Sequence, residues 1–191
     1  MKYANIYAAV GATVLLVGCA SAPRVAVNQP LGPAPTTAAK GTGGGSIVIY
    51  SARTPAYVDM YQDEWRWNND FGKNAFLYEA AHSDYTIYTQ TGDVFKHVRN
   101  ARDPNDDAPT VVKLPAGSYK VEAEAVNCDG NRVNVLMTVV VKPGQTTLAH
   151  LEGGWAPAGQ FGETQLAKLP CGRVIGWRAP ETGYAAIQPN R

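Results

Sequence analysis

The stretch LPAGSYKVEAEAVNCDGNRVNVLMTVVVKPGQTTLAHLEG, residues 114–153, decides the fold. In residues 119–126, apolar side chains fall on one face and Lys or Glu side chains on the other, which is the period-two pattern of a half-buried strand. Residues 133–141 carry Val or Met at every second position, and Leu136 and Val140 on the opposite face, which indicates a strand covered on both sides. Residues 146–151 begin with β-branched residues and predict a third strand.

Two turn signals separate these strands. Asn127, Asp129 and Gly130 form the first, because Gly accepts positive φ freely and Asn and Asp tolerate it better than most residues. Pro143 and Gly144 form the second, because Pro presets φ at the second turn position and Gly accepts positive φ at the third. The segment therefore predicts three consecutive antiparallel strands.

The order LPAGSYKVEAEA, a Gly turn, a Val-rich strand, PGQTT and a last strand resembles the end of prealbumin-like β-sandwich modules, such as PEGA and carboxypeptidase-regulatory-like domains. The resemblance covers residues 114–153, and residues 85–153 with the preceding strands. It implies an all-β fold, a single antiparallel β-sandwich of prealbumin-like or Ig-like type. Such modules are mostly non-catalytic accessory or adhesive units, and the fold alone does not give a function.

Alternation elsewhere extends this domain over residues 46–180, followed by a polar tail at residues 181–191. Gly and Pro throughout residues 155–170 predict an irregular segment. The remaining predicted strands are residues 46–53, 83–90, 94–100, 110–114 and 173–179.

The amino-terminal segment reads as a signal peptide. Lys2 precedes an apolar run from Ile6 to Val17, which is too short to span a bilayer as a helix and has the size of a signal-peptide core. Residues 16–19, Leu-Val-Gly-Cys, resemble the lipobox of bacterial lipoproteins. That resemblance implies removal of residues 1–18 and acylation of Cys19. The alternative is a signal peptide cut elsewhere, with Cys19 present by chance.

Several acyl chains on Cys19 would hold the protein on a membrane in practice permanently. Ala20, rather than Asp, follows Cys19, and resemblance to enterobacterial lipoprotein sorting then implies the outer membrane. Residues 19–45 are rich in Pro, Ala, Thr and Gly and predict a flexible tether after the lipidated Cys. We expect a lipoprotein of the cell envelope, a non-enzymatic structural or binding module at the periplasmic face of the outer membrane.

Residues 54–81 are rich in aromatic residues and weak in periodicity. Trp65 and Trp67 alternate as in a strand, and Tyr61 precedes them. One interpretation is that these rings cover an open sheet face. The alternative is an exposed platform for cell-wall glycan, peptidoglycan or an envelope protein, because Trp and Tyr offer apolar area with a polar tip.

If Cys19 is lipidated, Cys128 and Cys171 remain as an even pair in an oxidising compartment. A disulfide between them would tie the irregular segment 155–170 to the domain. The alternative is two buried free thiols. Neither Cys has a CxxC partner or a neighbouring His, so no metal site is predicted.

Charge and motifs argue against nucleic acid and against catalysis. The chain has 17 Lys and Arg against 16 Asp and Glu, and removal of Lys2 balances them, which leaves little attraction for a polyanion. His82, His97 and His150 lie in no metal-binding spacing, and no GxSxG elbow is present. We therefore predict no enzyme and no cofactor, with an accessory domain of a hydrolase as a further alternative; His150 is the histidine most worth inspecting.

Residues 101–109 predict a polar loop. Asp103, Asn105 and Asp107 stand at alternate positions, as at the start of a calcium loop. The Gly and Glu that such a loop needs further on are replaced by Ala108 and Leu114. We interpret the loop as a solvated turn, with a weak calcium site as the alternative.

Overall fold

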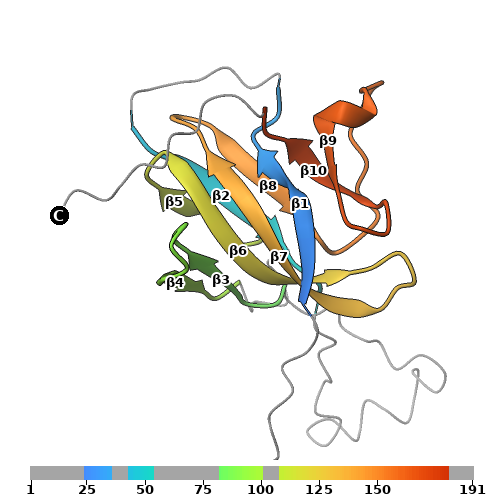
Figure 1. Cartoon of the computed structure of the whole chain (residues 1–191), viewed down its shortest axis with the longest axis horizontal. Coiled ribbons are helices and arrows are strands. Elements are labelled where there is room, and N and C mark those ends of the chain that lie inside the picture. Colours follow the sequence, from blue (N-terminus) through green and yellow to red (C-terminus); the bar gives the residue numbers. More distant parts are fainter. Residues whose placement is uncertain (1–23, 36–42, 54–81, 101–107, 181–191) are drawn as a thin grey trace, which may run out of the picture.

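The computed structural model describes residues 24–35, 43–53, 82–100 and 108–180, and these residues form an all-β body (Figure 1). The all-β prediction is confirmed. A short 3-10 helix, η1, and the strand β9 lie in the segment predicted to be irregular. The elements are β1 (Arg24–Gly32), β2 (Gly45–Tyr50), β3 (Tyr85–Tyr88), β4 (Val94–Val98), β5 (Val112–Leu114), β6 (Gly117–Val126), β7 (Arg132–Val141), β8 (Thr146–His150), η1 (Glu163–Gln165), β9 (Leu166–Lys168) and β10 (Val174–Arg178).

The strands form one curled sheet in the order β4-β3-β6-β7-β1-β10-β8-β2-β5, with β9 paired to β10 (Figure 1). β1 runs parallel to β7, and β2 runs parallel to β8. The prediction of a purely antiparallel sheet is therefore wrong, and the sheet is mixed. The other pairings in the described sheet are antiparallel.

The central hairpin forms as the alternation predicts. β6 and β7 pair antiparallel along their whole length, from Gly117↔Val141 to Val126↔Arg132, and Gly130 in the turn between them has a φ of 80°. Gly144 also has positive φ, but the third strand does not continue the meander. β8 pairs with β2 and β10 instead, because β1 already occupies the other edge of β7.

The strand β1 corrects the predicted tether and the predicted domain start at residue 46. β1 pairs with β7 from Arg24↔Asn134 to Val27↔Met137. Leu31, further along β1, is fully buried in the core. The Pro-, Ala-, Thr- and Gly-rich sequence around this segment hides a strand that is stabilised by pairing with the long strand β7.

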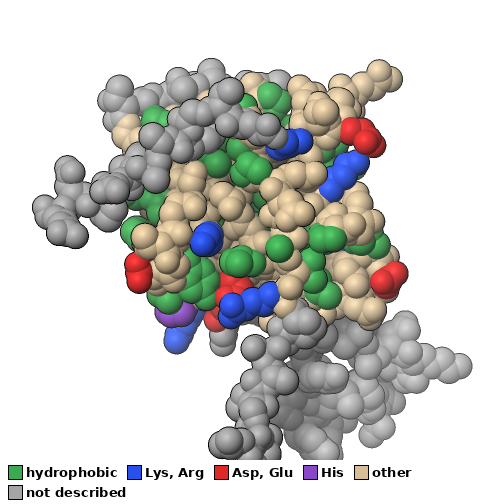
Figure 2. Space-filling view, in the orientation of Figure 1, with side chains coloured by type: hydrophobic (Ala, Val, Ile, Leu, Met, Phe, Trp, Pro, Cys, Tyr) green, Lys and Arg blue, Asp and Glu red, His purple; other side chains and the backbone are tan. Residues whose placement is uncertain are grey.

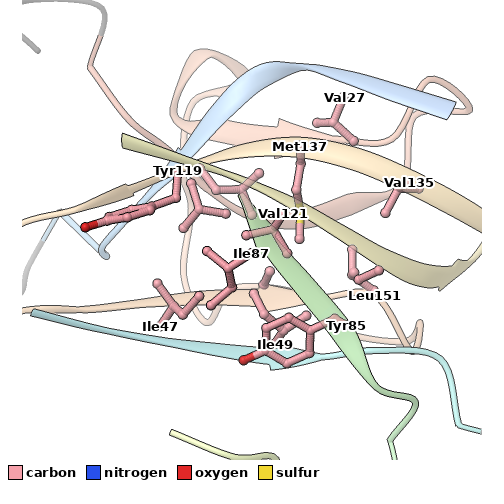
Figure 3. Close-up of a cluster of buried hydrophobic side chains, with 14 of the residues drawn as sticks. Val27, Ile47, Ile49, Tyr85, Ile87, Tyr119, Val121, Val135, Met137 and Leu151 are labelled. Carbon is pink, nitrogen blue, oxygen red and sulfur yellow. The ribbon is translucent and has the colours of Figure 1, made fainter. Parts of the chain in front are cut away.

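The core lies between two facing parts of the curled sheet. In Figure 3 the side chains of Val121, Met137 and Ile87 point toward those of Ile47 and Ile49 on β2. These five side chains have exposures of 1% or less. Burial of such a side chain contributes about 1.5–3 kcal/mol relative to its exposure, so this packing holds the two parts of the sheet together.

The sheet comes close to closing on itself at one end. The backbone N–H of Ala52 donates to Glu124 O at 2.8 Å, and that of Ser83 donates to Ala52 O at 3.0 Å. The N–H of Val126 donates to Leu151 O at 2.8 Å. The ends of β2, β6 and β8 and the approach to β3 therefore meet at one place.

Candidate functional site

Several predicted site residues lie outside the described ranges. They are the lipidation candidate Cys19 and the aromatic residues Tyr61, Trp65 and Trp67, and the polar loop with Asp103, Asn105 and Asp107 lies outside as well. Within the described ranges, no helix has the length and apolar character needed to cross a membrane. No group of three or more His, Cys, Asp or Glu side chains in those ranges is placed to hold a metal ion.

Cys128 and Cys171 form a disulfide, with their Cα atoms 5.9 Å apart, which confirms the predicted pair. Cys128 lies in the turn between β6 and β7, and Cys171 lies in the turn between β9 and β10. Both residues are exposed. The bridge therefore joins two hairpin turns at the surface and ties the segment after β8 to the central hairpin.

A column of three stacked rings lies on the outer face of the sheet. Tyr50 and His150 end β2 and β8 and are paired in register, while their neighbours Ile49 and Ala149 point into the core. The rings of Tyr50 and His150 are stacked with their centroids 4.5 Å apart. The rings of His150 and Trp155 are also stacked with centroids 4.5 Å apart, and only 2° separates their planes. The imidazole of His150 thus lies between two larger rings.

Further rings fix the segment after β8 against the sheet. The ring centroid of Trp177 on β10 lies 6.2 Å from that of Trp155 and 4.4 Å from that of Phe161, and both pairs are arranged edge-to-face. His82 meets Tyr50 edge-on at 5.6 Å. Aromatic pairs of this kind contribute about 0.5–1.5 kcal/mol beyond their buried area, so they hold the Gly- and Pro-rich segment in place.

The polar atoms around the column are only partly paired. His150 Nδ1 lies 3.3 Å from Glu152 Oε1, and His82 Nδ1 lies 2.7 Å from Ser51 O. Among the described atoms, Nε2 of both histidines and Oε2 of Glu152 are buried without a hydrogen-bond partner. Nε and Nη2 of Arg173 are in the same state.

The Arg173 guanidinium lies over the backbone of Gly153, the residue that follows Glu152 in the chain. A Cβ at Gly153 would be 2.6 Å from Arg173 Nη1, so the absence of a side chain at Gly153 makes room for the arginine. We call Tyr50, His82, His150, Glu152, Trp155 and Arg173 the aromatic–histidine site.

A buried asparagine fixes the backbone on one side of the aromatic–histidine site. Asn100 Nδ2 donates to Ser83 O at 2.9 Å and to Ser51 Oγ at 3.1 Å, while its Oδ1 accepts from the N–H of Thr110 at 3.1 Å. Ser51 Oγ also donates to Ser83 O at 2.6 Å. These bonds hold together the ends of β2 and β4 and the approaches to β3 and β5.

Access to the imidazole of His150 is restricted in the described structure. An imidazole beside a carboxylate is an arrangement used for general-base chemistry. However, Tyr50 and Trp155 cover both faces of the His150 ring, and no described hydroxyl or thiol bonds to its Nε2. Tyr50 and Trp155 are themselves half-buried, so parts of both rings remain open to solvent beside the covered imidazole.

Two open hollows lie at opposite ends of the body. One, of about 480 Å³, lies over the outer face of β3, β4, β6 and β7. The other, of about 670 Å³, lies beyond the ends of β1 and β10 and is lined by residues that include Pro33, Lys142, Gln145, Arg178 and Pro180.

No protein-family model, curated protein or solved structure matches this chain.

Proposed function

We propose that the chain is a lipid-anchored protein of the bacterial cell envelope. In this proposal residues 1–18 are removed, Cys19 is acylated, and the β-rich body faces the periplasm from the outer membrane. The observation that carries the proposal is the exposed Cys128–Cys171 disulfide. Disulfides persist in oxidising compartments such as the periplasm, which agrees with export directed by residues 1–18.

The body itself is proposed to be a non-enzymatic structural or binding module, with a hydrolase-associated accessory domain as its alternative. The stacking of His150 between two rings supports this, since it restricts approach to the imidazole. A relation to prealbumin-like or Ig-like sandwiches is part of the same proposal. Its support is the β6–β7 hairpin and the two facing parts of the curled sheet.

Labelled palmitate tests the anchor. Cells expressing the wild-type chain are expected to incorporate the label, and Cys19→Ala is expected to abolish it. The double variant Cys128→Ser with Cys171→Ser is the matched control, because it removes the other two cysteines and should keep the label. Label that survives Cys19→Ala would disprove the anchor.

Binding of cell-wall glycan is the second candidate function. The aromatic–histidine site favours it, because sugar rings stack on aromatic side chains while their hydroxyl groups bond to side chains such as Glu152 and Arg173. Retention on purified peptidoglycan sacculi should fall in Trp155→Ala and, if the predicted platform takes part, in Trp65→Ala. Phe95→Ala, at an exposed ring on β4, is the control. Equal retention of all four proteins would end the glycan hypothesis.

A further inference from the structure

We infer that the end of the body where β1 begins lies against the headgroup layer of the membrane that carries the anchor. The inference rests on the proposed acylation of Cys19. Only five peptide steps separate Cys19 from Arg24, the first residue of β1, and they span at most about 18 Å even when fully extended. A tether reaching residue 45 would instead have allowed a distance on the order of 90 Å.

The start of β1 is firmly fixed to the body. Arg24 pairs with Asn134 of β7, and the next three residues continue the parallel ladder. The Arg24 side chain also lies 2.8 Å from Glu122 Oε1. The strand therefore cannot lengthen the link to the membrane without losing its pairing with β7.

The pairing of β1 with β7 and of β7 with β6 also identifies which end of the body is held close to the membrane. Asn134 is paired with Glu124 of β6, and Glu124 O accepts the N–H of Ala52 just after β2. The start of β1 and the end of β2 thus share one end of the body (Figure 1). Gly117, at the start of β6, lies seven residues from Glu124, or about 23 Å along the strand. The start of β6 therefore lies at the end of the body away from the start of β1.

The chemistry of the near end suits lipid headgroups. Arg24 pairs with Glu122 and Arg132 pairs with Glu124, and the lower rim in Figure 2 shows side chains of both signs. Charged groups are costly to move into hydrocarbon, so this end is expected to rest on the hydrated headgroups rather than insert. The hollow of about 670 Å³ at the other end then opens away from the membrane.

Fluorescence quenching tests this orientation. The acylated full-length protein is placed in phosphatidylcholine vesicles that contain a lipid with a nitroxide on its headgroup. A fluorophore is attached to a new thiol, either in Arg99→Cys near the start of β1 or in Pro115→Cys just before β6. Both positions are exposed. The inference expects several-fold stronger quenching at position 99.

A lengthened link supplies the control. Ten Gly and Ser residues inserted between Pro23 and Arg24 should lower the quenching at position 99 toward the value at position 115, because a flexible link lets the body move away. If the protein is acylated but quenching is equal at the two positions, or stronger at 115, the orientation is wrong while the anchor stands. If the wild-type chain takes up no palmitate, the proposed anchor fails and this inference fails with it.

Discussion

Tyr85 on β3 provides a sharp test of the core. Its ring is 3% exposed, and its hydroxyl has no hydrogen-bond partner among the described atoms. Burial raises the pKa of Tyr85 because the charged phenolate is poorly solvated there. A buried hydroxyl without a partner costs about 1–3 kcal/mol, so Tyr85→Phe should raise the free energy of unfolding at neutral pH by about 1 kcal/mol.

Tyr119 on β6 is the matched control. It is also buried, at 8% exposed, but its hydroxyl donates to Pro115 O at 3.1 Å. Tyr119→Phe should therefore lower the free energy of unfolding by about 0.5–1.5 kcal/mol. Urea unfolding of both variants with the disulfide intact gives the comparison.

The same two tyrosines predict a loss of stability at high pH. Burial raises the pKa of Tyr85 and of Tyr119 in the folded protein, while an unfolded tyrosine titrates near pH 10. The stability is fully present below about pH 10; above it the unfolded chain loses these protons first, and the free energy of unfolding falls by up to about 1.4 kcal/mol per pH unit for Tyr85, with a smaller contribution from the less deeply buried hydroxyl of Tyr119. Tyr85→Phe should make this fall shallower. The reasoning is refuted if Tyr85→Phe is less stable than Tyr119→Phe, or if the alkaline loss is unchanged.

Four further changes test other parts of the structure. Reduction of Cys128–Cys171 should lower the free energy of unfolding by about 2–4 kcal/mol, seen as a lower melting temperature in reductant. Leu31→Ala should lower the free energy of unfolding in urea by about 2–5 kcal/mol if β1 is part of the core. An unchanged free energy of unfolding would instead favour the predicted flexible tether. Asn100→Ala removes the acceptor of the Thr110 N–H and one of the two donors to Ser83 O, and it should lower the free energy of unfolding by about 1–3 kcal/mol, with Asn100→Asp restoring only the acceptor. Trp155→Ala removes one face of the His150 stack and should speed proteolysis within residues 152–165 with little change in the rest of the body, as limited proteolysis followed by mass spectrometry would show.

The parts of the fold that the sequence predicts are those in which local pattern and tertiary packing agree. In β6 the predicted alternation is repeated in the burial of every second side chain from Tyr119 to Ala125. The turns at Gly130 and Gly144 follow from residues that accept positive φ. β1 could not be predicted in this way, because its pairing partner β7 lies about a hundred residues further along the chain and its own composition resembles a linker.

The candidate site shows the same division. His150 could be placed on a predicted strand, and the Cys128–Cys171 pair could be inferred from the compartment and from the even number of thiols. The column of stacked rings could not be predicted from the sequence, because Tyr50 and His150 become neighbours only through the parallel pairing of β2 with β8. An aromatic residue and a histidine at the ends of two strands were the available signal, and only knowledge of the pairing gives that signal meaning.

The position of β1 links the topology of the sheet to its orientation on a membrane. By covering the edge of β7, β1 prevents β8 from continuing the meander and removes a long unpaired edge that would invite pairing with another chain. Since β1 is also the first described element after Cys19, the same pairing shortens the link between the anchor and the core. An insertion before Arg24 should therefore change the distance to the membrane without changing stability, whereas loss of Leu31 packing should change stability first, and this difference separates the two roles of one strand.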